Sequence, residues 1–295
     1  MPFRNLYKNI LHVVTFFIPL QKYIVWCMKV KKVLFVNQEV TPYVPESPMS
    51  LIGKKLPQAM QEKGCEIRTF MPKWGGINER RGQLHEVIRL SRMMLIINDT
   101  DHPLIIKVAS IPSTRLQVYF IDNEDYFSKE QTAANAGKSG NDDNGERVVF
   151  FARGVLETVK KLRWTPDIIH CQGWMSVIVP LYVKTAYHDE PAFADAKVVT
   201  SLFDNSLETS FGKDFAKTAD YRSAKAKLLS KYGDFGYNDL CKLAIDYSDG
   251  IIQENEGISA ELKDYIAEKQ IPVMTKSDGQ DIANVYGAFY DQIIG

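Results

Sequence analysis

The segment from Lys31 to Pro57 constrains the fold more than any other part of the chain. Residues 33–36 form a short, uniformly apolar run, which is typical of a strand buried on both faces of a parallel sheet. A polar loop with several prolines follows, and an amphipathic helix is predicted from about Met49. A strand that leads through a loop into a helix is the first unit of a doubly wound α/β domain, in which ligands bind at that loop.

The rest of the chain alternates predicted strands and helices. Strands are expected at residues 65–71, 104–109, 116–121, 166–171, 197–201 and 250–253, with weaker candidates at 84–90, 95–97 and 272–274. Helices are expected at 146–162, 173–187, 213–230, 237–247, 258–268 and 282–294. This alternation predicts an α/β fold with a doubly wound, mostly parallel, Rossmann-like sheet that is covered by helices on both faces.

Two helix starts carry specific local signals. Ser47 and Pro48 suit the N-cap and the first position of the first helix. Asp143, with Glu146 three residues later, predicts an aspartate variant of the capping box at the next long helix. The small and polar residues 131–145 before it are expected to form a mobile surface loop.

Charge and cysteine content exclude several classes of function. The 295 residues carry 36 basic and 36 acidic side chains, so no basic excess points to a nucleic-acid partner. The four cysteines are scattered without a C-x-x-C motif, which argues against a disulfide framework or a zinc site and favours the reducing cytoplasm. No metal and no cofactor is expected.

Residues 1–28 form an apolar N-terminal extension that precedes the first predicted strand. Its uninterrupted apolar run, 10–20, is shorter than the roughly 20 residues needed to span a bilayer. Three interpretations stay open: an extension upstream of a true start at Met28, a membrane-associating segment, or a signal peptide without an evident cleavage site. The main domain is therefore expected at residues 29–295.

Several motifs occur in a recognisable order. After the first strand, Q-E-V-T-P-Y-V-P-E-S-P-M-S-L-I-G-K-K-L-P aligns without a gap to S-E-V-x-P-x-x-K-x-G-G-L-A-D-V-x-x-x-L-P. D-N-G-E-R at 143–147 matches D-N-x-x-R, and H-C-Q-G-W-M at 170–175 follows the frame H-x-H-D-W-H. Together they resemble the N-terminal domain of bacterial glycogen synthases and plant starch synthases, the ADP-glucose-dependent glycosyltransferases of family five. The sequence of residues 77–91 is similar to that of the Bacteroidetes branch of this family.

The resemblance implies one half of a two-domain, B-type glycosyltransferase with its active site in the cleft between two Rossmann-like domains. It implies transfer of glucose from ADP-glucose to the non-reducing end of an α-1,4-glucan. The cleft candidates that match the family's motifs are Glu39, Asp143, Asn144, His170, Gln172 and Trp174. No motif of the second domain is found after Ser201, so this chain is expected to correspond to the acceptor half alone.

The family's donor-binding residues are replaced in the first loop. Pro45 stands at the position of the lysine, Ser47 and Pro48 at the glycine pair, and Leu51 at the aspartate. A glycine pair at a helix N-terminus lets backbone N–H groups approach a diphosphate, and a lysine neutralises the leaving group. Proline has no N–H to donate. The sequence therefore predicts a structural helix start instead of a phosphate cradle, and little or no binding of ADP-glucose.

The other candidates each have two readings. Glu39 is a site residue or an exposed loop carboxylate, and Asp143 is a cleft residue or a helix cap. His170 is catalytic or a core histidine, and Trp174 stacks on a sugar or packs in the core. Gln172, at the position of the family's central histidine, can bind a hydroxyl group but cannot carry a proton.

These departures predict a degenerate relative that is inactive alone. One alternative is a non-catalytic protein that binds an α-glucan such as glycogen or regulates a protein partner through its exposed cleft face. Another is a half-enzyme completed in trans, and a third is an unrelated small-molecule binder that reuses the fold.

Overall fold

The computed structural model describes residues 31–112, 114–128, 132–133, 143–204, 207–208, 210–276 and 281–295. The predicted extension at 1–28 and most of the predicted loop at 131–145 lie outside these residues. None of the described helices is long and apolar enough to cross a membrane.

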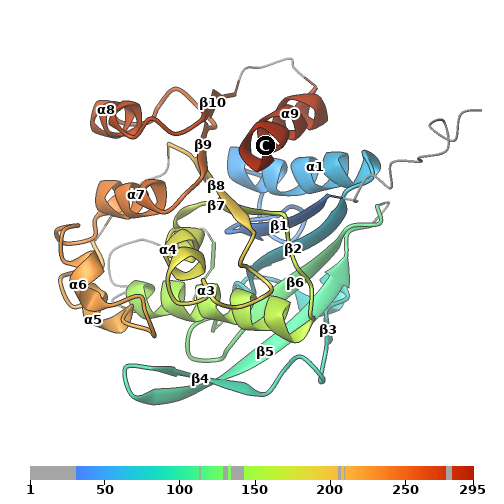
Figure 1. Ribbon diagram of the computed structural model, residues 1–295. Helices are drawn as coiled ribbons and strands as arrows, with labels where there is room; N and C mark the ends of the chain where they lie inside the picture. The colour runs from blue at the N-terminus through green and yellow to red at the C-terminus, as the bar shows by residue number, and fades with distance from the viewer. Residues whose placement is uncertain are drawn as a thin grey trace, which may run out of the picture. The chain divides into compact units, whose positions relative to one another are not determined.

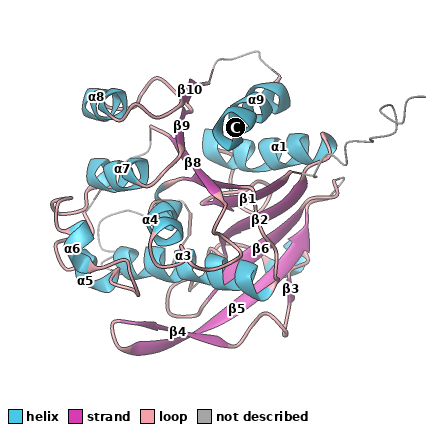
Figure 2. Cartoon of the chain, in the orientation of Figure 1, coloured by secondary structure: helices cyan, strands magenta, loops and turns pink. Residues whose placement is uncertain are grey.

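The described strands form one sheet in the order β10-β9-β8-β7-β1-β2-β6-β5-β3, with β4 paired to β5 (Figures 1 and 2). All neighbours from β10 to β6 are parallel, and β5 pairs antiparallel with β6, β3 and β4. The strands are β1 Lys32–Asn37, β2 Glu66–Pro72, β3 His85–Glu86, β4 Met93–Ile97, β5 Thr100–Ser110, β6 Gln117–Asp122, β7 Ile168–Gln172, β8 Lys197–Leu202, β9 Gly250–Gln253 and β10 Val273–Thr275.

Helices cover both faces of this sheet, which confirms the predicted α/β fold. The described helices are α1 Pro48–Glu62, α2 Glu79–Gly82, α3 Asn144–Lys161, a 3-10 turn Trp174–Ser176, α4 Val179–Lys184, α5 Phe215–Thr218, α6 Ala226–Leu229, α7 Tyr237–Asp246, α8 Ala260–Glu268 and α9 Ile282–Ile294. In Figure 1, α1 and α9 lie side by side on one face, and α3 and α4 lie on the other.

Two predicted helices are wrong in extent. The segment 173–187 begins with Gly173 at φ +80°, continues as a 3-10 turn, and becomes α-helical only at Val179, with Pro180 in the first turn. The segment 213–230 holds two short helices, α5 and α6. Between them the Asp220 carboxylate accepts the backbone N–H of Ala226 at 3.0 Å, a local bond that competes with helical pairing.

Strand β1 is the centre of the fold. Its residues from Val33 to Asn37 are fully buried, as the apolar run predicts. The chain proceeds from β1 through α1 to β2 on one side, and later returns to β7 on the other side. The sheet therefore has its topological switch point between β1 and β7, where ligands of doubly wound domains bind at the carboxyl ends of the strands.

Candidate functional site

The switch point brings together two predicted site segments. The loop 38–47 follows β1 and leads into α1, and Gln172 ends β7, with residues 173–174 directly after it. Asn37 and Gln172 are neighbours in the parallel ladder, so their side chains lie on the same face. The sequence alignment and the strand order thus point to the same place.

The N-terminus of α1 is capped by the chain itself. Ser47 has extended backbone angles, and its hydroxyl accepts the N–H of Ser50 at 2.9 Å, while the Ser50 hydroxyl accepts the N–H of Ser47 at 2.8 Å. Pro48 occupies the first helical position and has no N–H. The predicted cap is confirmed, and it uses donors that a bound phosphate would need.

A carboxylate lies against this cap. The Ser47 hydroxyl donates to Glu39 Oε2 at 2.7 Å, and the Gln38 amide lies 3.3 Å from Glu39 Oε1. A negative group near the first turn of a helix is favourable because the helix dipole is positive there. Glu39 therefore supplies to α1 the charge that a phosphate would supply. At the other two altered positions, Pro45 is exposed and accepts the Ser50 hydroxyl through its carbonyl, and Leu51 is half-buried.

Gln38 closes the space between this loop and β7. Its side chain is buried, and its Oε1 accepts the N–H of Met175 at 3.4 Å. Gly173, at φ +80°, lies directly beneath, because a Cβ there would sit 2.6 Å from Gln38 Oε1. Only a glycine permits this approach. A ligand at the switch point would have to displace Gln38.

His170 and Gln172 are both fully buried on β7. The His170 ring lies 2.6 Å from the Tyr290 hydroxyl and 2.7 Å from the Ser201 hydroxyl, and burial lowers its pKa to about 3. Such a group is a neutral part of the core at neutral pH. Gln172, in contrast, has no hydrogen-bond partner for either amide atom among the residues that the structure describes, and within the same residues the neighbouring Asn37 has an unpaired oxygen.

Replacing Gln172 by methionine is expected to stabilise the protein. An unpaired buried polar group costs about 1–3 kcal/mol, and methionine has a similar volume without this cost, so the free energy of unfolding should rise by about 1 kcal/mol. Urea unfolding measures the change. The exposed Gln117→Met is the matched control and should shift stability by less than about 0.5 kcal/mol. A loss of stability in Gln172→Met would instead indicate a buried water that bonds the amides of Asn37 and Gln172.

The two tryptophans near the site belong to the core. Trp174 is 2% exposed, and its ring meets Phe211 edge to face with 5.9 Å between ring centroids. Trp74 is fully buried and donates from its indole N–H to the Gln38 carbonyl at 2.8 Å. In this conformation neither indole offers a face to a sugar.

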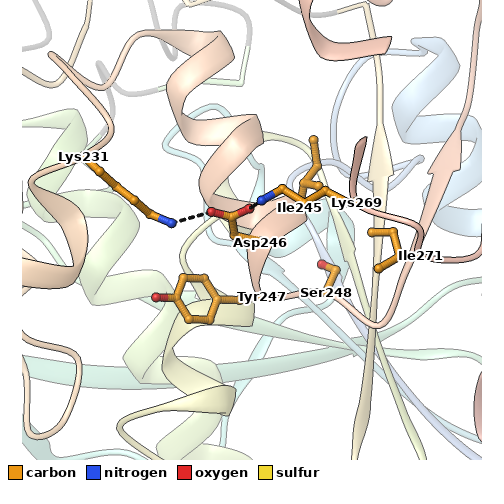
Figure 3. A pocket seen from close by; sticks show the side chains of 7 residues that line it. All are labelled: Lys231, Ile245, Asp246, Tyr247, Ser248, Lys269 and Ile271. Atoms are coloured by element: carbon orange, nitrogen blue, oxygen red, sulfur yellow. Dashed lines mark hydrogen bonds and ion pairs between the residues drawn. The ribbon is translucent and has the colours of Figure 1, made fainter. Parts of the chain in front are cut away.

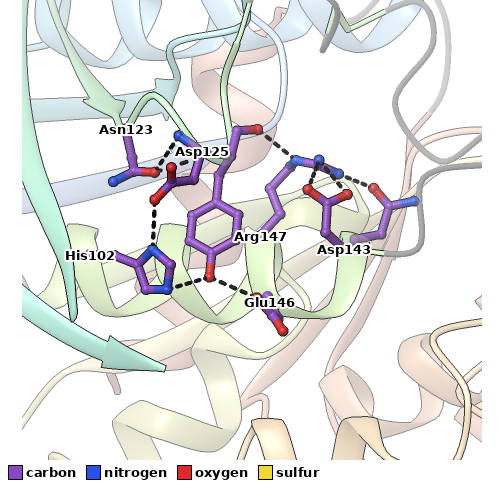
Figure 4. A network of polar contacts seen from close by, with 8 residues as sticks. His102, Asn123, Asp125, Asp143, Glu146 and Arg147 are labelled. Carbon is purple, nitrogen blue, oxygen red and sulfur yellow. Dashed lines mark hydrogen bonds and ion pairs between the residues drawn. The ribbon is translucent and has the colours of Figure 1, made fainter. Parts of the chain in front are cut away.

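Asp143 and Asn144 are held by a buried arginine at the start of α3 (Figure 4). Arg147 is fully buried, and its Nη2 donates to both oxygens of Asp143 at 2.6 Å. It also bonds the side-chain oxygen of Asn144 and, at 2.8 Å, the carbonyl of Tyr126. The predicted capping box is wrong. Asp143 is at the N-cap but makes no side-chain cap bond, because its carboxylate turns to the guanidinium.

A second chain of polar contacts continues from this point and was not predicted. The Tyr126 hydroxyl donates to Glu146 Oε2 at 2.9 Å and lies 3.1 Å from His102 Nε2, whose Nδ1 is 3.0 Å from Asp125. These contacts form because the β4–β5 hairpin places His102 beside α3. No local pattern marks this contact, although His102 is an inward residue of an alternating strand.

A metal site needs its ligands, which include cysteine thiols and His, Asp or Glu side chains, grouped around one point. Among the described residues, no three His, Cys, Asp or Glu side chains are grouped as metal ligands. Cys65, Cys171 and Cys241 are free thiols, and burial raises the pKa of Cys171 and Cys241. Buried thiols with raised pKa values are poor nucleophiles.

Comparisons with known proteins agree with the motifs. A family model described as starch synthase catalytic domain matches residues 32–270. Glycogen synthase of Chlorobium limicola is 41% identical over 172 residues, and that of Chlorobium luteolum is 42% identical over 173. Each match covers 58% of this chain and 35% of the relative, so the chain spans about a third of the length of these curated relatives.

A solved structure shares the fold. The catalytic domain of starch synthase IV from Arabidopsis thaliana, bound to ADP and acarbose, superposes with a TM-score of 0.63 at 17% identity. The match covers 84% of this chain and 52% of that chain. At this identity the likeness establishes the arrangement of strands and helices, and the site must be judged from the residues described above.

Proposed function

The chain belongs to the family of starch synthase catalytic domains, and from this premise we propose that it binds an α-glucan without holding a nucleotide sugar at its first βα loop. Its curated relatives are glycogen synthases, and the solved relative holds ADP and acarbose. The glucan part of the proposal is supported by this membership. The nucleotide part is supported by the chain's own residues.

The single observation that carries the proposal is the occupied N-terminus of α1. Ser47 and Ser50 cap each other, Pro48 offers no N–H, and Glu39 holds a negative charge 2.7 Å from the Ser47 hydroxyl. A diphosphate at this point would meet the Glu39 carboxylate, and Pro45 stands where the resemblance places a lysine. Loss of a single preorganised donor commonly costs about 10²–10³ in rate, so several losses predict no measurable glucose transfer.

Calorimetry with ADP-glucose tests the nucleotide part. We expect no binding heat with the full chain at ligand concentrations up to about 1 mM, corresponding to less than roughly 4 kcal/mol of binding free energy. A variant that restores the residues of the resemblance, Pro45→Lys with Ser47→Gly, Pro48→Gly and Leu51→Asp, is the matched comparison and should bind more tightly. Micromolar affinity of the unaltered chain would refute the proposal.

Glucose transfer is the second candidate function, and the 41–42% identity to glycogen synthases favours it. Incorporation of labelled glucose from ADP-glucose into glycogen distinguishes the two. We expect retention of the chain by immobilised glycogen and no incorporation. Incorporation above a protein-free blank would establish transfer and remove the non-catalytic interpretation.

A further inference from the structure

A cavity of about 410 Å³ is lined by residues that precede β9 and β10, at the amino-terminal ends of these strands (Figure 3). Its wall includes Asp246, Tyr247 and Ser248, which precede β9, together with Lys231 and Lys269. It is called the Asp246 pocket below. Its volume falls within the range of about 300–1,000 Å³ that is usual for small-molecule sites.

Asp246 fixes the two lysines of the pocket. Its carboxylate accepts from Lys231 Nζ at 2.7 Å and lies 2.5 Å from Lys269 Nζ. The hydroxyls of Tyr232 and Tyr265 donate to it at 2.6 and 2.8 Å. Burial raises the pKa of Asp246, but these hydrogen bonds outweigh it and hold the pKa well below its usual range. The carboxylate therefore stays ionised. Each ammonium also lies over a tyrosine ring, Lys231 over Tyr232 at 4.7 Å and Lys269 over Tyr265 at 4.6 Å, which leaves a remaining N–H to bond a ligand.

The charges around the Asp246 pocket nearly cancel. Two lysines bring positive charge, and one carboxylate opposes them. Helix α7 ends at Asp246 and helix α8 ends beside its C-cap Lys269, and each helix C-terminus carries about half a negative charge. An anion or a cation would gain little here. The pocket instead suits a neutral ligand that is rich in hydroxyl groups.

Tyr247 gives the Asp246 pocket an aromatic side. Its ring is half-buried and lines the cavity, as Figure 3 shows. The ring also packs against the main hydrophobic core, and among the described residues it makes no aromatic or cationic contact and its hydroxyl makes no hydrogen bond. An amphipathic ring beside fixed N–H donors can contact the C–H face of a pyranose while the donors bond its hydroxyls.

We propose that the Asp246 pocket is a second carbohydrate site, which takes one or two glucose units of an α-glucan against Tyr247 with hydroxyls bonded by Lys231 and Lys269. The inference rests on the proposed glucan binding and adds the place where it occurs. The site lies at the amino-terminal edge of the sheet, away from the switch point. A glucan held there would leave the carboxyl-terminal edge free.

Affinity electrophoresis of the full chain in gels that contain glycogen tests the proposal, and maltotriose titration by calorimetry gives the affinity. Tyr247→Ala removes the ring contact and is expected to weaken binding about threefold to tenfold. Lys231→Met removes one donor from a side chain that is 58% exposed, so it should fold normally and weaken binding about threefold to tenfold. Lys213→Met, at a lysine 85% exposed outside the pocket, is the matched control and should bind as the unaltered chain does.

The outcomes separate this inference from the proposed function. If the unaltered chain binds glycogen and both pocket variants bind equally well, the Asp246 pocket is not the site, while glucan binding stands. If the unaltered chain does not bind glycogen, both are wrong. Competition by inorganic phosphate at millimolar concentration would overturn the inference, because it would show an anion site.

Discussion

Replacing Arg147 by methionine is expected to lower the free energy of unfolding by about 3 kcal/mol. The change leaves buried hydrogen-bond acceptors unpaired and removes the bonds that hold the start of α3. The guanidinium is fully buried and donates hydrogen bonds to the Asp143 carboxylate, the Asn144 side chain and the Tyr126 carbonyl. Asp143 is 38% exposed and can turn to water. The larger cost falls on Asn144 and on the Tyr126 carbonyl, which methionine cannot bond.

Urea unfolding compares Arg147→Met with Arg81→Met. Arg81 is exposed, and its replacement should change stability by less than about 0.5 kcal/mol. Arg147→Lys keeps the charge but lacks the planar guanidinium that bonds three separate acceptors. It should therefore recover only part of the lost stability. A cost below about 1 kcal/mol for Arg147→Met would show that water replaces the guanidinium.

The first βα unit could be predicted because its signals are local. The buried run at 33–36 marks the strand, and Ser47 with Pro48 marks the helix start within four residues of the bonds that they make. Resemblance to a known family then located the altered donor positions. In this region the physical consequence, a self-capped helix, follows from residue types alone.

The rest of the site depends on partners that lie far away along the chain. Asp143 reads as a helix cap in sequence, yet it binds an arginine whose position is fixed by the Tyr126 carbonyl, 21 residues from Arg147. Gln38 closes the switch point only because Gly173 lies under it. The helix predicted at 213–230 fails for a different reason, because a local bond from the Ala226 N–H to the Asp220 carboxylate interrupts it. Patterns of apolar spacing carry no information about such bonds.

His170 shows the same dependence on distant partners, and its environment predicts a measurable loss of stability in acid. Ser201 donates to Glu254 at 2.7 Å, so the Ser201 oxygen must accept from His170 Nε2, and Nδ1 must accept from the Tyr290 hydroxyl. Both ring nitrogens are thus satisfied in the neutral ring. A proton added to Nδ1 would face a hydroxyl instead of a carboxylate.

The direction of the pH effect follows from the shifted pKa. The folded-state pKa of His170 is about 3, against an ordinary value of 6.5, because burial penalises the charged ring. Between these values the unfolded chain binds a proton that the folded chain excludes, so this group removes about 1.4 kcal/mol of stability per pH unit as pH falls below 6.5. Burial raises the pKa of Glu254, which takes up a proton earlier when folded and offsets part of the loss.

Comparison with His170→Gln isolates the histidine, because the glutamine amide can donate to Ser201 and accept from Tyr290 without titrating. We expect the free energy of unfolding of the unaltered chain, relative to this variant, to fall by about 2–3 kcal/mol between pH 6.5 and 4.5 in urea titrations. The offset from Glu254 is common to both proteins and cancels. His85→Gln, at an exposed histidine, should leave the pH dependence of the unaltered chain in place. Parallel pH curves for the unaltered chain and His170→Gln would mean that the folded and unfolded chains protonate His170 alike, which would contradict this prediction.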